Sequence, residues 1–124
     1  MRVLIVDDDA IVVRSCRRVL EAEGMDIHTA NTVAQGVAML TEADFDLMLT
    51  DIKMPGQDGF AMIARARQLR PDLPILMMSG YSTAETIANG RRLGADNHIA
   101  KPFTPEELLI AVRNTIVSIH ERHL

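Results

Sequence analysis

The fold of this chain can be predicted from the stretch Val3-Leu4-Ile5-Val6-Asp7-Asp8-Asp9, in which a short apolar run ends in three acids. Such a run, bounded by polar residues, is typical of a strand that is buried on both faces of a parallel sheet. Further short runs at residues 47–50, 75–78 and 98–100 each end at one reactive polar residue, respectively Asp51, Ser79 and Lys101. Because ligands bind at the carboxyl ends of parallel strands, we expect these side chains to converge at one edge of a sheet.

The segments between these runs carry the signals of helices. We predict helices over about residues 11–23, 33–43, 59–69, 83–93 and from 105 onward, with one more strand at residues 26–30. Ser82 with Glu85, and Thr104 with Glu107, have the spacing of a capping box, and Pro105 suits the first helical position. Five strands alternating with five helices predict an α/β fold, a doubly wound parallel sheet within a single domain of residues 1–124.

The composition narrows the class of protein. With 124 residues, 48% of them apolar, the chain is long enough for one domain with a hydrophobic core. Its net charge of −4 argues against general nucleic-acid binding, and no apolar stretch has the length of a transmembrane helix or the form of a secretory signal. The single cysteine, Cys16, lies on the expected inner face of the first helix and fits a buried role in a reducing cytosol. We therefore expect a cytoplasmic domain without membrane or nucleic-acid partners.

The polar residues after the strands suggest a site for a divalent cation and a phosphoryl group. Carboxylates from Asp7, Asp8 and Asp51 would need a hard cation to offset their repulsion, and Mg²⁺ is held by such groups. A carboxylate such as Asp51 can act as a nucleophile, while a hydroxyl and an ammonium suit phosphoryl oxygens. Each residue alone has a simpler role: Asp9 is expected to cap the first helix, Asp51 and Ser79 suit turns, and a lone lysine is usually solvated. Their joint occurrence at successive strand ends favours the phosphoryl site.

Five motifs in order along the chain resemble the receiver domain of bacterial two-component response regulators. They are Val6-Asp7-Asp8; Thr50-Asp51-Ile52-Lys53-Met54-Pro55 with Asp58-Gly59; Met78-Ser79-Gly80; Gly94-Ala95-Asp96; and Lys101-Pro102-Phe103. The resemblance covers essentially the whole chain and implies the flavodoxin-like strand order 2-1-3-4-5, which is that of the chemotaxis receiver. It also implies phosphorelay signalling rather than turnover catalysis. The phosphoryl donor would be a phosphohistidine on a sensor histidine kinase or a histidine phosphotransfer protein.

The resemblance assigns the acceptor and the metal ligands. Asp51 matches the phosphoacceptor. Asp8 and Asp51, together with the backbone carbonyl of Lys53, match direct ligands of Mg²⁺, and Asp7 matches the acid that holds the ion through water.

The resemblance also assigns the residues that sense the phosphoryl group. Ser79 matches the switch hydroxyl that turns toward it, and Lys101 matches the lysine that pairs with one of its oxygens. Lys53 and Tyr81 occupy the two positions that tune hydrolysis of the acyl phosphate. His98 departs from the pattern, because the family often has Tyr or Phe there as a rotating switch. An imidazole is smaller and ionises near neutral pH, and a residue that packs passively in its strand is the alternative.

The mode of output and three other functions remain open at this level. No output domain follows the fifth helix, so the signal would pass to a protein partner unless the chain is one domain of a larger regulator. Ile110 and Val117, together with the fourth helix, offer a possible homodimer surface. A phosphatase that forms an aspartyl phosphate would share the reactive residues but would need a cap insertion. A flavodoxin would place a Ser-, Thr- and Gly-rich loop where this chain has three aspartates, and a degenerate receiver would act only as a binding module.

Overall fold

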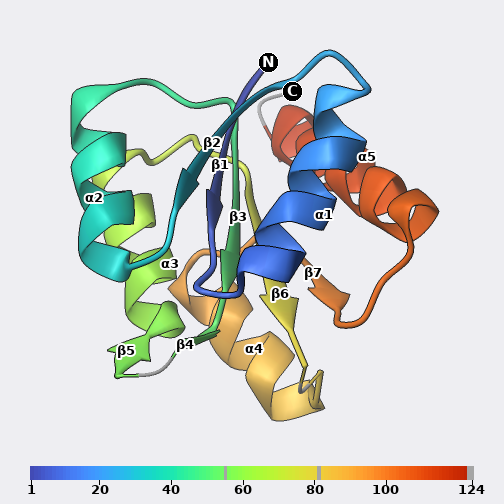
Figure 1. Cartoon of the computed structure of the whole chain (residues 1–124). Helices are drawn as coiled ribbons and strands as arrows, with labels where there is room; N and C mark the ends of the chain where they lie inside the picture. Colours follow the sequence, from blue (N-terminus) through green and yellow to red (C-terminus); the bar gives the residue numbers. More distant parts are fainter. Residues whose placement is uncertain (55, 81, 123–124) are drawn as a thin grey trace.

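The computed structural model describes residues 1–54, 56–80 and 82–122, and its centre is a five-stranded parallel sheet (Figure 1). The strands are β1 (Arg2–Val6), β2 (Asp26–Ala30), β3 (Leu47–Asp51), β6 (Ile75–Ser79) and β7 (Asn97–Ala100). Their spatial order is β2-β1-β3-β6-β7, and every neighbouring pair is parallel. The predicted order 2-1-3-4-5, counted over these five strands alone, is therefore confirmed.

A short antiparallel pair, separate from the main sheet, follows β3. It consists of β4 (Lys53–Met54) and β5 (Gln57–Asp58), and Lys53 lies opposite Asp58. Gly56 between them has φ 69°, in the left-handed region that favours glycine. Strands of two residues are too short to give a periodic sequence signal, so the motif at residues 53–58 indicates only a loop. The pair shapes the segment that leads from the end of β3 into the next helix.

Helices cover both faces of the sheet (Figure 1). One face is covered by α1 (Ala10–Glu21) and α5 (Pro105–Arg122), and the other by α2 (Val33–Glu42), α3 (Gly59–Leu69) and α4 (Ala84–Leu93). Cys16 of α1 and Val112 of α5 belong to the first core, as the buried role expected of Cys16 requires. Within the described residues, no helix combines the length and the apolarity needed to cross a membrane.

The two central strands explain why the sequence contains continuous apolar runs. All five residues of β3 and all five of β6 are buried. Successive side chains point to opposite faces, so Leu47 and Leu49 enter the core under α1 and α5 while Met48 enters the core under α2 and α3. Full burial of one such side chain stabilises the fold by about 1.5–3 kcal/mol. Both strands include the predicted site residue, Asp51 or Ser79, as their last member.

Side-chain hydrogen bonds at the first turns of α1 and α5 confirm the caps that were predicted there. The Asp9 carboxylate accepts hydrogen bonds from the backbone of Ile11 at 3.0 Å and so caps α1 as expected. Thr104 and Glu107 form the predicted reciprocal capping box, with N–H to oxygen distances of 3.0 and 3.1 Å.

The predicted start of the fourth helix at Ser82 is wrong by one residue. Thr83 is the N-cap of α4, and its hydroxyl oxygen accepts a hydrogen bond from the backbone N–H of Thr86 at 3.1 Å. Ser82 and Thr83 are adjacent residues of equal capping chemistry. With Thr83 as the cap, Glu85 falls in the first turn of α4, where the helix dipole favours an acid.

One arginine of α3 ties together the loops at the amino ends of β6 and β7. Arg67 donates to the Asp96 carboxylate at 2.9 Å, to the carbonyl of Gly94 at 2.6 Å and to that of Leu73 at 2.7 Å. The same Asp96 oxygen also accepts the backbone N–H of Ile75 at 2.9 Å. We call these two charged residues and their backbone partners the Arg67–Asp96 clamp.

Candidate functional site

Three carboxylates meet at the carboxyl edge of the sheet. Asp7 follows β1 directly and Asp51 ends β3, and these strands are neighbours, with Val6 opposite Thr50. Carboxylate oxygens of Asp7, Asp8 and Asp51 all lie within 4.8 Å of one another. Asp7 and Asp51 are buried, at 1% and 5% exposed, whereas Asp8 is exposed. We call these three residues the acidic cluster. Its oxygen donors and its opening to solvent fit a hard divalent cation such as Mg²⁺.

Lys101 reaches this cluster from the end of the edge strand β7. It follows β7, an edge strand, and its backbone N–H donates to the carbonyl of Ser79 at 2.8 Å. Its Nζ lies 2.8 Å from the Asp7 carboxylate and 3.4 Å from that of Asp51. The structure thus brings together the predicted lysine and two of the predicted acids. Lys101 has the position from which an ammonium could move onto a phosphoryl group attached to Asp51.

Ser79 completes the predicted set. It is the last residue of β6, the strand between β3 and β7, and it lies opposite Ala100 in the register. Ser79 is buried, with 3% of its surface exposed. Ser79 therefore lies at the same sheet edge as Asp51 and Lys101, on the strand between theirs.

Burial and charge perturb the ionisation of this site. Burial raises the pKa of Asp51; the nearby Lys101 charge lowers it, the Asp7 charge raises it further, and the net shift is upward. Burial alone would lower the pKa of Lys101, but its hydrogen bond to Asp7 and the charges of both acids outweigh burial and raise it. Lys101 is closer to Asp7 than to Asp51, so its charge compensates Asp7 more fully. One ammonium facing three carboxylates leaves an excess of negative charge that a divalent cation would neutralise.

The segment after Asp51 holds the carboxylate in place. The backbone N–H of Lys53 donates a hydrogen bond to the Asp51 carboxylate, and the Lys53 side chain is exposed. The start of α3 packs against the same segment. A Cβ at Gly59 would lie 2.3 Å from Cα of Ile52 and 2.4 Å from the carbonyl oxygen of Asp51. Gly59 was named in the sequence only as part of a motif; the structure shows that it permits this contact between two backbones.

Two predicted modulators differ in what the structure tells about them. His98 lies on β7 opposite Met77, it is partly buried, and its Nδ1 is a buried atom with no hydrogen-bond partner in the described part of the chain. Tyr81 lies outside the described residues.

On α5, Ile110 and Val117 are each 51% exposed, off the core face as predicted.

A sequence match to a known family spans all the positions of this site. The family model of the response regulator receiver domain matches residues 3–113. The cell cycle response regulator CtrA of Brucella ovis is 30% identical over 112 residues, which are 90% of this chain and 48% of that protein. The chain therefore spans about half the length of the curated relatives it matches.

Comparisons of structure agree over nearly the full chain. A CheY-like response regulator receiver domain protein from Methanospirillum hungatei is 34% identical, with a TM-score of 0.90 that covers 98% of this chain and 97% of that one. The chemotaxis response regulator CheY4 of Vibrio cholerae is 29% identical, with a TM-score of 0.87 over 92% of this chain and 97% of that one.

Proposed function

Because the chain belongs to the receiver-domain family of two-component response regulators, we propose that Asp51 is its phosphoacceptor in a phosphorelay. The donor is a phosphohistidine on a sensor histidine kinase or a histidine phosphotransfer protein. The carboxylate oxygen of Asp51 attacks phosphorus, the phosphorus–nitrogen bond of the donor breaks, and the imidazole of the donor leaves. The protein itself promotes this transfer and the later hydrolysis of the acyl phosphate, without turnover of a separate substrate.

The acidic cluster fits the Mg²⁺ that this chemistry requires. Asp8, Asp51 and the backbone carbonyl of Lys53 would hold the ion directly, and Asp7 would hold it through water. The observation behind this assignment is that carboxylate oxygens of all three acids lie within 4.8 Å of one another, while among the described residues Lys101 is the lysine that pairs with Asp7 and Asp51. When bound, the ion neutralises negative charge that would repel the incoming phosphoryl group.

Lys101 and Ser79 then recognise the phosphoryl group. Lys101 exchanges its contact with Asp51, at 3.4 Å, for a phosphoryl oxygen, and it keeps its shorter contact with Asp7 as an anchor. The Ser79 hydroxyl turns to donate a hydrogen bond to another phosphoryl oxygen. Both groups neutralise charge on the oxygens, which is the main demand that phosphoryl transfer makes on a protein.

The output of the domain leaves through α4, β7 and α5. Movement of Ser79 repacks the surface of α4 and β7, and His98 occupies the strand position next to this change. Lys53 and Tyr81 set the lifetime of the phosphorylated state by crowding the path of the attacking water. Residues 1–124 act as one cytoplasmic receiver unit, and the signal passes to a downstream protein or to an output domain joined to this unit. Ile110 and Val117 give the surface for a homodimer.

The contact of Lys101 with Asp7 and Asp51 at the acidic cluster carries this proposal, and phosphorylation tests it. With Mg²⁺ and acetyl phosphate, the intact mass should rise by one phosphoryl group, and Asp51→Asn should abolish the rise because an amide is a poor nucleophile. Asp44→Asn is the matched control, since Asp44 is an exposed acid at the other end of the sheet that pairs with Arg70. Labelling of the Asp51→Asn variant at the wild-type rate would remove Asp51 from its role.

A further inference from the structure

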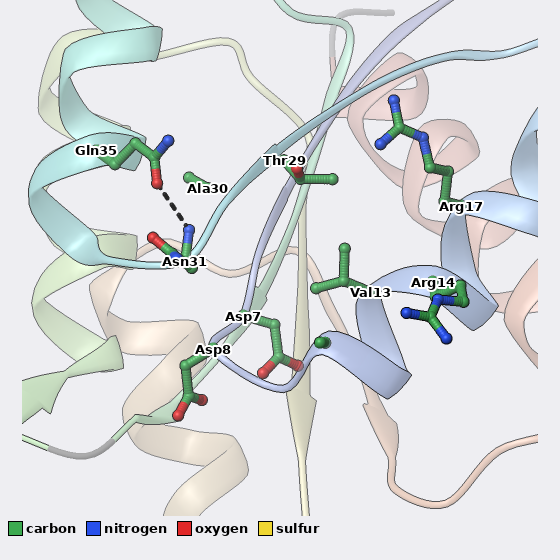
Figure 2. A pocket seen from close by; sticks show the side chains of 10 residues that line it. Asp7, Asp8, Val13, Arg14, Arg17, Thr29, Ala30, Asn31 and Gln35 are labelled. Atoms are coloured by element: carbon green, nitrogen blue, oxygen red, sulfur yellow. Dashed lines mark hydrogen bonds between the residues drawn. The ribbon is translucent and has the colours of Figure 1, made fainter.

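A pocket of about 470 Å³ opens beside the acidic cluster (Figure 2). It lies between α1, the end of β2 and the start of α2. Its lining combines two carboxylates, two guanidinium groups, three further polar side chains and a small apolar wall: Asp7, Asp8, Arg14, Arg17, Thr29, Asn31, Gln35, Ala10, Val13 and Ala30. A volume of this size suits a small organic molecule. The proposed function uses only the two aspartates.

The two arginines differ in how far they are committed to other groups. Arg17 pairs with Glu21 at 2.5 Å and donates to the carbonyl of Ile27 at 3.3 Å. Arg14 is exposed, and its side chain makes no hydrogen bond or ion pair with the described residues. Figure 2 shows both guanidinium groups on the α1 side of the pocket, with Asp7 and Asp8 at its lower end. Arg14 therefore has its donors available for a ligand in this pocket.

The charges of the lining make anion binding depend on the cation. Lys101 already compensates Asp7, and Glu21 compensates Arg17, so without metal the charges of Asp8 and Arg14 offset one another and an anion gains little. A divalent cation on the acidic cluster would neutralise Asp8 and leave the charge of Arg14 in excess. A pocket of this volume is roughly 8 Å across, which is within a Debye length at physiological salt, so the charges act on one another. Guanidinium groups match the oxygens of a phosphate in a bidentate manner.

We propose that this pocket binds the phosphate group of a small organic phosphate ester, chiefly through Arg14, when a divalent cation occupies the acidic cluster. The apolar wall of Ala10, Val13 and Ala30 takes the organic part. The proposal rests on the metal site of the proposed function. By linkage the effect is reciprocal, so the ester must raise the affinity for Mg²⁺ by the same factor as Mg²⁺ raises the affinity for the ester.

The test is a titration of the ¹⁵N-labelled protein followed by NMR, with phenyl phosphate as the probe. In the presence of Mg²⁺, phenyl phosphate should shift the amide signals of Thr29, Asn31 and Gln35, and its affinity should fall roughly tenfold when Mg²⁺ is removed, a typical size for coupled sites. Inorganic phosphate should bind more weakly at the same amides, because it lacks the apolar part. Equal affinity with and without Mg²⁺, or shifts confined to Ser79 and Lys101, would overturn the proposal.

Two variants locate the site. Arg14→Ala should weaken phenyl phosphate by about tenfold, the order of a lost charge-assisted contact. Arg18→Ala is the control, because Arg18 is an exposed neighbour on α1 that does not line the pocket. Equal losses in the two variants would mean that the net charge of α1, and not this pocket, attracts the anion.

A titration with Mg²⁺ alone separates this proposal from the proposed function. If Mg²⁺ shifts no amide near Asp8, the proposed metal site is refuted, and the Mg²⁺-dependent binding in the pocket is refuted with it. If Mg²⁺ binds and acetyl phosphate labels Asp51, but phenyl phosphate shifts none of the pocket amides, only the pocket is refuted.

Discussion

The amino and carboxyl edges of the sheet each hold a cluster of charged side chains, and the two clusters differ in their balance of positive and negative charge. At the amino edge, Arg67 and Asp96 form an ion pair at 2.9 Å, and both side chains also contact backbone groups of the two loops that precede β6 and β7 and of the first residue of β6. At the carboxyl edge, one ammonium from Lys101 faces the three carboxylates of the acidic cluster. The first arrangement is balanced and holds loops together. The second is left short of positive charge, which suits the cation and the phosphoryl group that we propose for it.

This difference teaches where stability and reactivity are located in the chain. A buried ion pair whose hydrogen bonds are all made is costly to break, because removal of one partner leaves an unpaired charge. A cluster of like charges lowers stability until a ligand compensates it, and the binding of that ligand then stabilises the fold. The following experiments would break or sharpen the comparison between the two edges.

The largest effect is expected at the Arg67–Asp96 clamp. Arg67→Met should lower the free energy of unfolding by about 3–5 kcal/mol, because Asp96 would remain buried without its partner. Urea denaturation measures this loss. Arg65→Met, an exposed site on the same helix, is the control and should change stability little. The Mg²⁺ affinity of the folded Arg67→Met protein should be that of wild type; a weakened affinity would show that the two edges are not independent.

A smaller loss is expected at the contact between α3 and the end of β3. Gly59→Ala should lower stability by about 1–3 kcal/mol, because its Cβ would collide with the backbone of Asp51 and Ile52. It should also weaken Mg²⁺ binding, since the displaced backbone carries the Asp51 carboxylate. Gly36→Ala is the matched control. Its Cβ would crowd only the side chains of Met62 and Val6, at 3.1 and 3.2 Å. Equal losses of Mg²⁺ affinity in the two variants would argue against a specific role for Gly59.

The acidic cluster itself should respond in the opposite direction. Asp8→Ala removes one repelling charge and should stabilise the metal-free protein by up to about 1 kcal/mol, a small figure because Asp8 is exposed. Wild type should gain about 2.7 kcal/mol at a Mg²⁺ concentration one hundred times its Kd, and the variant should gain far less at that concentration. Thermal unfolding with and without Mg²⁺ measures both. Glu23→Ala, which changes the net charge equally at an exposed site, should leave the Mg²⁺ effect intact.

At neutral pH the smallest effect on stability is expected at Cys16, whose thiol reports on the carboxyl edge, because its ionisation matters only in alkaline solution. Burial, followed by the charge of Asp7, raises its pKa to about 11. The unfolded thiol ionises near pH 9, so between pH 9 and 11 the unfolded chain releases this proton while the folded chain retains it. The contribution of Cys16 to stability is therefore complete below pH 9 and is lost as the pH rises toward 11.

Ultraviolet absorbance of the thiolate, taken as the difference between wild type and Cys16→Ala so that the tyrosine signal cancels, gives the reading, because the chain has a single cysteine. The midpoint in the folded protein should lie near 11, and Asp7→Asn should lower it by removing the second cause. A wild-type midpoint near pH 9 would mean that α1 opens readily to solvent.

The sequence predicts the carboxyl edge much better than the amino edge. Asp7, Asp51, Ser79 and Lys101 each follow or end a buried run, so a local pattern places all of them at one edge before any contact is known. The Arg67–Asp96 pair has no such signal. Its members are 29 residues apart, on a helix and in a loop, and the helix also carries the exposed Arg65 two positions away. Only the packing of α3 against the loops selects this partner.

Other details escape prediction because they depend on close approach in three dimensions. Ser82 and Thr83 are equally good caps by chemistry, and the path of the chain decides between them. The need for glycine at position 59 arises from its contact with the backbone of Ile52, which no periodic pattern shows. Arg14 looks like any solvated residue of an amphipathic helix until the pocket beside the acidic cluster is seen.

The pairing of Asp7 with Lys101 has a consequence for the folding of the chain while it is synthesised on the ribosome. These residues are 94 positions apart, so the first acid of the site is synthesised long before the lysine that partners it. β7, which brings Lys101 to the edge, is the last strand of the sheet to emerge. A nascent chain can assemble β1 and β3 and display its acids, but it lacks the ammonium until nearly all of the domain has left the exit tunnel. The carboxyl edge therefore gains the positive charge that pairs with Asp7 only after the last strand of the sheet has joined β6.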